Sequence, residues 1–338
     1  MKKILVLVLV LLFATVGTSF AQKKEYRFGM ALQTLQNPFY LSLKAGAEKA
    51  AAELGNVKLF IVGAEHSTDL TTQVKQIEDF IQMKMDTIGI VAIERKGIIP
   101  TIEKVNKAGI PVLTIDTDSD GGKRECYIAT DNVLGGSLGA EWIIRALNGK
   151  GKIAILEGAP GSQVNALRLQ GFRAEIDKAK GIQVVSSLTA KWRRDEGMRV
   201  MNDILTAHPD LDAVMALNDE MALGALEALR ARGKLKQVKL VGYNGAAEAI
   251  QQVYRGNMAA DVVQYAERMG ELFVHWSVRI AQGQKPPADL PKTPTTPPTV
   301  HIDSGVAVVD QPLLQIKVGP SLKVIENELK FYTGQKPI

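Results

Sequence analysis

Strict alternation of short apolar runs with helical patterns constrains this 338-residue chain more than any other feature. Most of the runs are bounded by Gly, Pro, Asn or Asp, as buried parallel strands are. A parallel connection needs a long crossover, which a helix usually supplies, so the alternation predicts doubly wound parallel α/β sheets. The expected strands are Tyr26–Leu32, Val57–Gly63, Thr87–Ile93, Pro111–Ile115, Cys126–Thr130, Lys152–Glu157, Ile182–Leu188, Ala213–Leu217, Val238–Tyr243 and Met258–Val263.

Helical patterns fill the segments between these strands, with apolar residues at three- and four-residue spacing. Several begin with the chemistry of a helix N-terminus: Pro38 suits a first turn, while Asp69 and Asn218 can cap backbone N–H groups. Asp219 and Glu220 are expected to interact with a helix dipole rather than with a ligand. The expected helices include Pro38–Leu54, Leu70–Met83, Ile98–Lys107, Asn132–Leu147, Val164–Lys178, Asp195–Ala207 and Glu220–Ala231.

The alternation divides into two units of the same rhythm, at about residues 23–128 and 129–264. The remaining C-terminal part differs: it has a helix over Glu267–Ile280, a proline-rich stretch over Lys285–Pro298 and a last strand over Gly305–Val309. A chain that crosses three times between two lobes explains this difference. We therefore expect two doubly wound lobes joined by a three-segment hinge. The expected N-terminal lobe comprises residues 22–128 and 265–300, and the C-terminal lobe comprises residues 129–264 and 301–338.

The N-terminus has the pattern of a secretory signal peptide. Lys2 and Lys3 precede an apolar run over Ile4–Ala14, and a small-residue segment ends at Ala21. The run is shorter than the about 18 apolar residues expected of a membrane-spanning helix. We expect residues 1–21 to be the signal peptide, cleaved after Ala21, and the mature protein to be a soluble periplasmic monomer.

Composition and charge disfavour several classes of protein. Removal of the signal peptide with its two lysines lowers the formal net charge from +5 to +3, and basic residues are interspersed with acidic ones, so no nucleic-acid partner is expected. The single cysteine, Cys126, allows no internal disulfide, and its place in an expected strand favours a buried thiol. The four histidines lack metal-ligand spacing, and no catalytic pairing is evident. We expect no enzyme activity, metal or cofactor.

Polar and aromatic residues gather where the expected strands end, which is where open α/β sheets bind their ligands. Amide, carboxylate and guanidinium groups can hydrogen-bond hydroxyl groups in pairs, and aromatic rings can cover the C–H face of a sugar ring. Such a mixture is typical of a small-ligand pocket. The candidate ligand-binding residues are Asn37, Phe39, Tyr40, Asp116, Asp118, Arg168, Trp192, Asn218, Asn244 and Gln264.

Two segments admit other interpretations. Residues 116–121 match the opening of an EF-hand loop, but position 12 would be Tyr127 in place of the closing Glu, so an ordinary turn is favoured over calcium. Residues 158–162 are glycine-rich and precede a helix, but they lack the Gly-Lys-Ser/Thr of a phosphate loop. For Trp192 a core role, and for Arg168 an interlobe ion pair, are the alternatives to ligand contact.

Five short segments keep the order and spacing of a known family. They are Asn37-Pro38-Phe39-Tyr40, Ile128-Ala129-Thr130-Asp131-Asn132, Arg168-x-x-Gly171-Phe172, Ala207-His208-Pro209-Asp210 and Asn218-Asp219-Glu220-Met221-Ala222-Leu223-Gly224-Ala225-Leu226. Over roughly residues 26 to 283 the chain resembles the periplasmic ribose-binding proteins, type I sugar-binding proteins that share a fold with the core of lac-type repressors. The resemblance implies a ligand between the lobes, touching the candidate residues other than Asp118. It places the three crossings near Ile128–Ala129, Gln264–Tyr265 and Thr299–His301.

Two positions depart from the pattern of that family. Ribose binders of this kind carry an Arg directly after the pocket Asp, where this chain has Thr117, and an Asp where it has Asn244. Loss of one charged donor and one charged acceptor changes which hydroxyl groups can be paired, and a site built for one pattern rejects others. We therefore expect another pentose, hexose or polyol, rather than ribose, to bind most tightly.

These observations predict a solute-binding protein that closes two lobes around a monosaccharide or polyol. The expected partner is the permease of an ABC importer, with a chemoreceptor as a further candidate. The alternative function is a sensory protein that presents a non-sugar small polar ligand to a chemoreceptor or sensor kinase. A repressor is excluded because a signal-peptide pattern, and no helix-turn-helix, precedes Tyr26.

Overall fold

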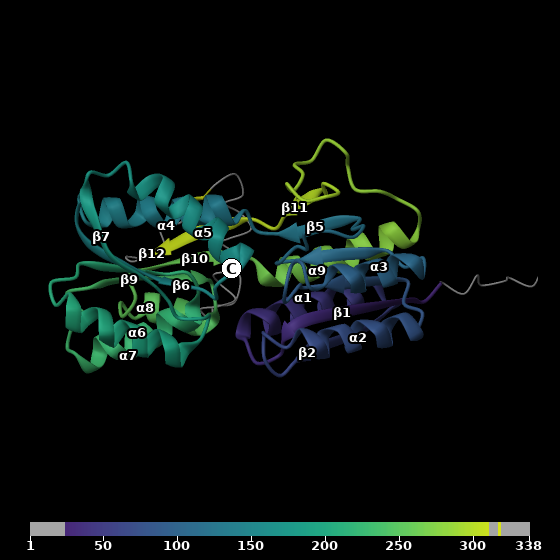
Figure 1. The fold of residues 1–338 in the computed structure, drawn as a ribbon, viewed down its shortest axis with the longest axis horizontal. Coiled ribbons are helices and arrows are strands. Elements are labelled where there is room, and N and C mark those ends of the chain that lie inside the picture. The colour runs from purple at the N-terminus through teal and green to yellow at the C-terminus, as the bar shows by residue number, and fades with distance from the viewer. Residues whose placement is uncertain (1–23, 311–316, 319–338) are drawn as a thin grey trace, which may run out of the picture.

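Two α/β lobes lie side by side along the long axis of the molecule (Figure 1). The computed structural model describes residues 24–310 and 317–318. The expected signal peptide (residues 1–21) and most of the C-terminal tail lie outside these residues. Among the residues described, no helix combines the length and apolar character needed to cross a membrane.

The first lobe contains a six-stranded sheet, in the order β11-β5-β4-β3-β1-β2, in which every strand pair is parallel. Helices α1 and α9 pack on one face and α2 and α3 on the other, so the central strands are buried on both sides. The elements are β1 (Tyr26–Thr34), α1 (Pro38–Leu54), β2 (Val57–Ala64), α2 (Leu70–Gln82), β3 (Thr87–Ile90), α3 (Ile99–Lys107), β4 (Val112–Ile115), β5 (Cys126–Ala129), α9 (Ala266–Ala281) and β11 (His301–Asp303).

The second lobe contains a seven-stranded sheet in the order β13-β12-β10-β9-β8-β6-β7. Its inner strands are parallel, whereas β12 and β13 are antiparallel to their neighbours. Figure 1 shows α4 and α5 on one face and α6, α7 and α8 on the other. The elements are α4 (Asn132–Ala146), β6 (Lys150–Glu157), α5 (Gln163–Ile176), β7 (Gly181–Thr189), α6 (Arg194–Ala207), β8 (Ala213–Ala216), α7 (Asp219–Ala231), β9 (Lys239–Asn244), α8 (Ala247–Tyr254), β10 (Ala260–Gln264), β12 (Val306–Asp310) and β13 (Lys317–Val318).

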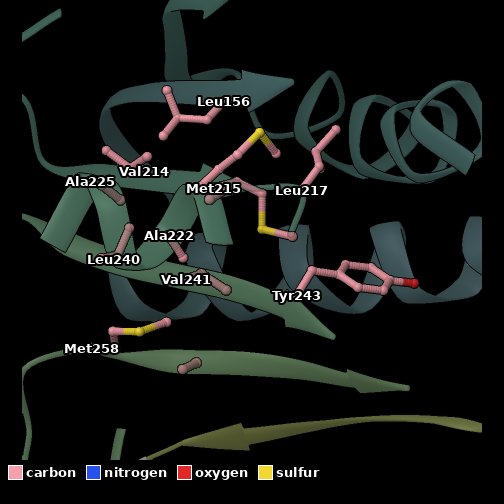
Figure 2. Packing of buried hydrophobic residues seen from close by; sticks show 14 of the residues in the cluster. Leu156, Val214, Met215, Leu217, Ala222, Ala225, Leu240, Val241, Tyr243 and Met258 are labelled. Atoms are coloured by element: carbon pink, nitrogen blue, oxygen red, sulfur yellow. The ribbon is translucent and has the colours of Figure 1, made fainter. Parts of the chain in front are cut away.

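Tyr243 lies at the edge of the hydrophobic core of the second lobe. Strands β8 and β9 contribute a continuous aliphatic layer that includes Met215 and Val241, both fully buried. Figure 2 shows Tyr243 beside this layer, near the carboxyl end of β9, with its hydroxyl group directed away from the aliphatic side chains. That hydroxyl donates to Oδ1 of Asn132 over 3.4 Å. The core therefore meets polar side chains at the end of the sheet that faces the first lobe.

Helices α4 and α5 approach each other closely enough to require glycine. A Cβ atom on Gly136 would lie 2.0 Å from the carbonyl oxygen of Arg168, and one on Gly171 would lie 1.9 Å from that of Val133. No other residue fits at such distances, so the two glycines set the spacing of the pair. This contact also fixes the position along α5 from which Arg168 extends.

Three crossings join the lobes, and the third differs from the one expected. The first two lie between β5 and α4 and at Tyr265, between β10 and α9. The expected third crossing at Thr299–His301 is wrong, because His301–Asp303 forms β11 and pairs with β5 in the first sheet. The chain crosses instead at Ser304–Gly305, so residues 301–303 belong to the first lobe.

Hydrogen bonds link the first and third crossings. The hydroxyl groups of Thr130 and Ser304 lie 3.1 Å apart, and the Thr130 hydroxyl lies 3.2 Å from the carbonyl oxygen of Gly305. Ser304 N–H donates to the carbonyl of Ala129 over 2.9 Å. Gly305 has a φ of +97° and would place a Cβ atom 3.2 Å from the ring of Tyr265 in the second crossing. The three segments therefore form one connected hinge.

Candidate functional site

A cleft opens between the two lobes at the carboxyl ends of their strands. It encloses about 480 Å³ of space free of protein atoms, including its open mouth, which is within the range of small-molecule sites. Its lining brings together every candidate residue predicted from the sequence except Asp118. The lining residues are Gln33, Asn37, Phe39, Tyr40, Ser67, Asp116 and Thr117 from the first lobe, and Ser162, Val164, Arg168, Trp192, Asn218, Asn244 and Gln264 from the second.

Arg168 is a firmly held cation of the cleft. Its Nε donates to Oδ1 of Asn132 over 2.8 Å, and its Nη1 donates to the carbonyl of Leu217 over 2.5 Å and to Oδ1 of Asn244 over 3.2 Å. The side chain is 2% exposed, yet none of these acceptors is a carboxylate. Its charge is therefore fixed in position by neutral groups and remains available to a polar ligand.

Two aromatic rings flank this guanidinium. Its central carbon lies 3.7 Å from the centre of the Tyr243 ring and 5.7 Å from that of Trp192. Such cation–π contacts favour the charged group. Burial raises the pKa of the Tyr243 phenol to about 12, so this ring stays neutral at physiological pH.

The loop that carries Trp192 has an unusual backbone. Lys191 and Trp192 have φ values of +54° and +65°, a region that bulky residues rarely adopt. The indole lies over Gly158, where a Cβ atom would come 2.0 Å from the ring. Asn218 donates from Nδ2 to the Trp192 carbonyl over 3.2 Å and helps to hold the loop. The half-buried ring is thereby directed into the cleft, so a pure core role does not describe it.

Asn244 and Gln264 form a polar pair at the ends of β9 and β10. Gln264 donates from Nε2 to Oδ1 of Asn244 over 2.8 Å, and the same oxygen accepts from Arg168. The amide oxygen of Gln264 is buried and has no hydrogen-bond partner among the described residues. The pair therefore offers a buried acceptor and the Asn244 amide group to a ligand.

Asp116 provides the carboxylate of the first lobe. It is 5% exposed, and its Oδ2 accepts from the hydroxyl of Thr117 over 3.0 Å. Burial raises the pKa of Asp116 to about 6, although Arg168 and the Thr117 hydroxyl oppose the shift. The carboxyl group is ionised at neutral pH, but its burial costs hydration free energy, and a ligand that donates hydrogen bonds to it would offset this cost.

The remaining first-lobe contacts come from the start of α1. Asn37 caps this helix, with its Oδ1 accepting from Phe39 N–H over 2.9 Å, so its amide N–H groups are left for a ligand. Phe39 and Tyr40 lie edge to face, with ring centres 5.2 Å apart. Burial raises the pKa of the Tyr40 phenol, which keeps it a neutral donor and acceptor.

Asn218 has a mainly structural position in the cleft. Its Oδ1 caps α7 by accepting from Met221 N–H over 2.9 Å, while Nδ2 donates to Trp192. One amide hydrogen remains for a ligand. Asn218 is thus both a helix cap and a lining residue of the cleft.

Asp118 does not line the cleft, so its assignment as a ligand-binding residue is wrong. Both of its oxygens are buried and accept from Arg124 over 3.2 and 3.3 Å, and Thr114 donates to it over 2.6 Å. The alternation of a strand would place residues 116 and 118 on one side. However, Asp116 has a φ of +56°, which turns the chain and separates the two carboxyls.

The other carboxylates of this segment also have separate partners. Asp120 forms an ion pair with Arg95. Among the described residues, no three His, Cys, Asp or Glu side chains form a group that could hold a metal ion. The EF-hand-like spacing of residues 116–121 therefore corresponds to three carboxyls with three different environments.

Five lining residues were not candidates from the sequence: Gln33, Ser67, Thr117, Ser162 and Val164. The sequence marks Thr117 only as a position that departs from the family pattern. Gln33 directly follows the expected strand Tyr26–Leu32 and could have been found by its position there, although β1 extends to Thr34. Ser162 is the cap of α5, a position that ordinarily signals only a helix start. Ser67 lies in the loop after β2 and could have been found by the strand-end rule. No sequence signal distinguishes Val164 from a core valine.

The assembled cleft suits a small neutral molecule with several hydroxyl groups. One buried cation and one buried anion face it, so it presents no net charge from these two groups. The amides of Asn37, Asn244 and Gln264 add fixed donors and acceptors between aromatic surfaces. Pairs of hydroxyl groups can satisfy such an arrangement, whereas an apolar ligand would leave buried polar groups unpaired.

Comparisons with known proteins agree with this description. Residues 28–285 match the family model described as a periplasmic binding protein domain. The chain is 38% identical over 263 residues to the ribose import binding protein RbsB of Bacillus subtilis, covering 78% of this chain and 84% of that protein.

Two solved structures have the same fold. An ABC transporter periplasmic solute binding protein from Actinobacillus succinogenes with bound D-allose has a TM-score of 0.78 at 28% identity, covering 85% of this chain and 98% of its own. A solute binding protein from Bacillus halodurans with bound myo-inositol has a TM-score of 0.76 at 28% identity, covering 85% and 95%. The predicted two-lobed architecture is confirmed by these similarities and by the two sheets described above.

Proposed function

Because the chain belongs to the periplasmic binding protein family, we propose that it captures a monosaccharide or related polyol in the cleft and delivers it to an ABC importer. The observation that carries this proposal is the convergence of Arg168, Asp116 and Gln264 on one cavity between aromatic rings. These groups come from both lobes, so a ligand that binds them all favours the closed state over the open one.

The two departures from the ribose-binding pattern affect the centre of this site. Thr117 donates its hydroxyl to Asp116, and Asn244 accepts from Arg168 and Gln264, so neither position adds a charge. The site therefore has fewer charged partners for hydroxyl groups than a ribose binder of this kind. We propose that a sugar or polyol other than ribose binds most tightly.

A thermal-shift panel tests the proposed ligand class. D-ribose, D-allose, D-arabinose and myo-inositol are added to the purified protein, after mass spectrometry of any molecule that co-purifies with it. A ligand at about 100 times its Kd stabilises the folded state by about 2.7 kcal/mol. Stabilisation by at least one of these polyols supports the proposal, and ribose outcompeting all others would contradict the specificity argument. Failure of all neutral polyols, with a shift from a charged metabolite, would refute the ligand class.

The proposed site of action is the periplasm. The family and the basic-apolar-small pattern of residues 1–21 support export, and cleavage after Ala21 would leave Gln22 as the mature N-terminus. Osmotic shock should release the protein, and N-terminal sequencing should begin at Gln22. Recovery in membranes with residues 1–21 intact would contradict this assignment.

Delivery to a permease has a direct test in membranes. Proteoliposomes that contain the cognate importer should hydrolyse ATP faster when the protein and its sugar are both present than with either alone. A protein that binds sugar but stimulates no importer, while activating a chemoreceptor or sensor kinase, would have the sensory function instead.

A further inference from the structure

Two carboxyl groups lie fully buried beneath the cleft, outside its lining. Asp219, at the start of α7, is 1% exposed, and Asp261, in β10, is 0% exposed. We refer to Asp219 and Asp261 as the carboxyl pair. Neither residue lines the cleft, and the ligand contacts described above make no use of them.

The carboxyl pair holds the turn that follows β9. Asp261 accepts from Gly245 N–H through Oδ1 over 3.0 Å, and Asp219 accepts from Ala246 N–H through Oδ2 over 2.7 Å. Gly245 and Ala246 directly follow Asn244, whose φ of +138° marks a sharp change in the chain direction. The position of the Asn244 side chain, which accepts from both Arg168 and Gln264, thus depends on the carboxyl pair below it.

The other two oxygens of the pair face each other across a glycine. A Cβ atom on Gly242 would lie 2.6 Å from Oδ1 of Asp219 and 2.6 Å from Oδ2 of Asp261. Each of these oxygens is buried and has no other hydrogen-bond partner among the described residues. Two ionised carboxylates in such contact would repel each other, whereas one proton between them supplies the missing hydrogen bond.

Within the described part of the chain, no ion pair offsets two negative charges at this position. On the elements that pack against the carboxyl pair, Glu220 of α7 and Glu248 of α8 both pair with Arg194 of α6 at the surface. Arg168 is held on Tyr243 and contacts neither carboxyl, although its charge lowers the pKa of Asp261. Burial is the main cause that raises the pKa values of both acids, and it raises the pKa of Asp261 to about 6.

We propose that Asp219 and Asp261 share one proton and act together as positioning residues that hold Asn244 in the ligand-binding geometry. The part of this proposal that concerns ligand binding rests on the proposed function of the cleft, whereas the shared proton does not. In the resting state, the carboxyl group of Asp219 donates its O–H to the Asp261 carboxylate, and each residue still accepts one backbone N–H.

Proton linkage gives a test that needs no ligand. An unfolded chain releases both protons near pH 4, but the folded protein retains one, so rising pH favours unfolding. Above pH 6.5, the unfolding equilibrium constant of the wild type should rise relative to that of Asp219→Asn, by about tenfold per pH unit for as long as the folded protein keeps the shared proton. The amide introduced by this substitution supplies both hydrogen bonds without a titrating proton, so other groups cancel in the ratio. If the unfolding constant of the wild type divided by that of Asp219→Asn stays the same within about twofold between pH 6.5 and 8.5, both carboxyls are ionised and the proposal is overturned.

Amide hydrogen exchange tests the positioning role without sugar. Asp219→Asn should leave exchange of Gly245 and Ala246 near the wild-type rate at pH 6.5, whereas Asp219→Ala should accelerate exchange of Ala246 at least about tenfold. Above the pH at which the unfolding ratio becomes flat, the wild type should lose this protection and Asp219→Asn should keep it. Unchanged exchange in Asp219→Ala, or loss of protection in both proteins together, would contradict the positioning role.

Sugar binding supplies the functional readout. Titrations with D-allose and myo-inositol at pH 6.5 should give Kd values for Asp219→Asn within about threefold of wild type, and at least about tenfold weaker for Asp219→Ala. If Asp219→Ala does not fold, the pH profile of the wild type against Asp219→Asn replaces it, with only the wild type weakening at high pH. If neither polyol binds the wild type, that choice of ligand fails, while the unfolding and exchange measurements still decide the carboxyl-pair proposal.

Discussion

The guanidinium carbon of Arg168 lies 3.7 Å from the centre of the Tyr243 ring, at the end of the second-lobe core. The cation thus rests on a ring that is itself part of the hydrophobic packing. Its other contacts, to Asn132, Leu217 and Asn244, come from separate elements. The group is therefore in place before a ligand arrives, and little side-chain entropy remains to be lost on binding.

Replacement of Arg168 should reduce both ligand binding and stability. Arg168→Ala removes three buried hydrogen bonds, leaves the Leu217 carbonyl without its donor and removes a packed side chain, so the free energy of unfolding should fall by about 2–4 kcal/mol even without ligand. Ligand-induced stabilisation should be lost as well. Urea unfolding and a thermal-shift titration measure the two effects.

Arg168→Lys separates charge from geometry, because lysine keeps the cation but lacks the planar fork. Binding should still weaken at least about tenfold. Arg193→Ala, which removes a surface ion pair with Asp195, is the matched control and should leave binding unchanged. Wild-type affinity in Arg168→Ala would place the ligand elsewhere.

Asp116→Asn should weaken ligand binding and raise the free energy of unfolding. Burial raises the pKa of Asp116 to about 6, so the stability that its protonated form contributes is lost as the pH rises through that value. At pH 7.5 the neutral amide should raise the unliganded free energy of unfolding by up to about 3 kcal/mol, while sugar binding weakens because the charged acceptor is gone. Asparagine also tolerates the φ of +56° at this position.

The pH profile of wild-type binding tests the same group. If the ionised carboxylate accepts ligand hydroxyl groups, affinity should decline as pH falls below about 6, with Asp116→Asn showing no such decline. Isothermal titration at pH 5, 6 and 7.5 distinguishes the two proteins. A parallel decline in both would assign the titration to another group.

Trp192 should report ligand binding directly. Trp192→Ala should weaken binding about tenfold, or about 1.4 kcal/mol, because the ring face is lost, and Trp192→Phe should recover most of it. Ligand-induced changes in tryptophan fluorescence should disappear in both variants. Trp142, which donates to Asp310, and Trp276 of α9 provide a constant background. A fluorescence change that persists in Trp192→Phe would place the ligand near one of those two residues.

Asp118 should matter for folding and not for binding. The Asp118–Arg124 ion pair is inaccessible to solvent, and removal of one partner leaves an unpaired buried charge. Asp118→Ala should therefore lower the free energy of unfolding by about 3–5 kcal/mol. Where the variant remains folded, its Kd should match that of the wild type. Selective loss of affinity with unchanged stability would restore Asp118 as a ligand contact.

Periodicity and strand-end position predicted most of the fold and of the cleft. The eleven expected strands, the last of them over Gly305–Val309, all occur, because short apolar runs bounded by turn-forming residues leave little choice of structure. Arg168, Asn244 and Gln264 were found because parallel strands bring their carboxyl ends together. These inferences depend only on local pattern and on one rule of topology.

The features that escaped prediction depend on conformation or on distant pairing. Strand β11 has three residues after a proline-rich segment and exists only because β5 lies beside it. The helix α8, eight residues long, was not among those expected. The different directions of Asp116 and Asp118 follow from a single positive φ, which no periodicity reveals. The contact of Asp219 with Asp261 joins residues of α7 and β10 and has no local signal.

The third crossing at Ser304–Gly305 has a consequence for biosynthesis. The first sheet needs β11 at its edge and α9 on its face, and the second sheet needs β12, although the ribosome supplies these segments last. A nascent chain that ends at residue 264 therefore contains neither lobe in finished form, and vectorial folding of the N-terminal half alone is disfavoured. This late completion should delay stable folding until nearly the whole chain has been made, which suits the export proposed above, because an unfolded chain passes through a membrane more readily than a folded one.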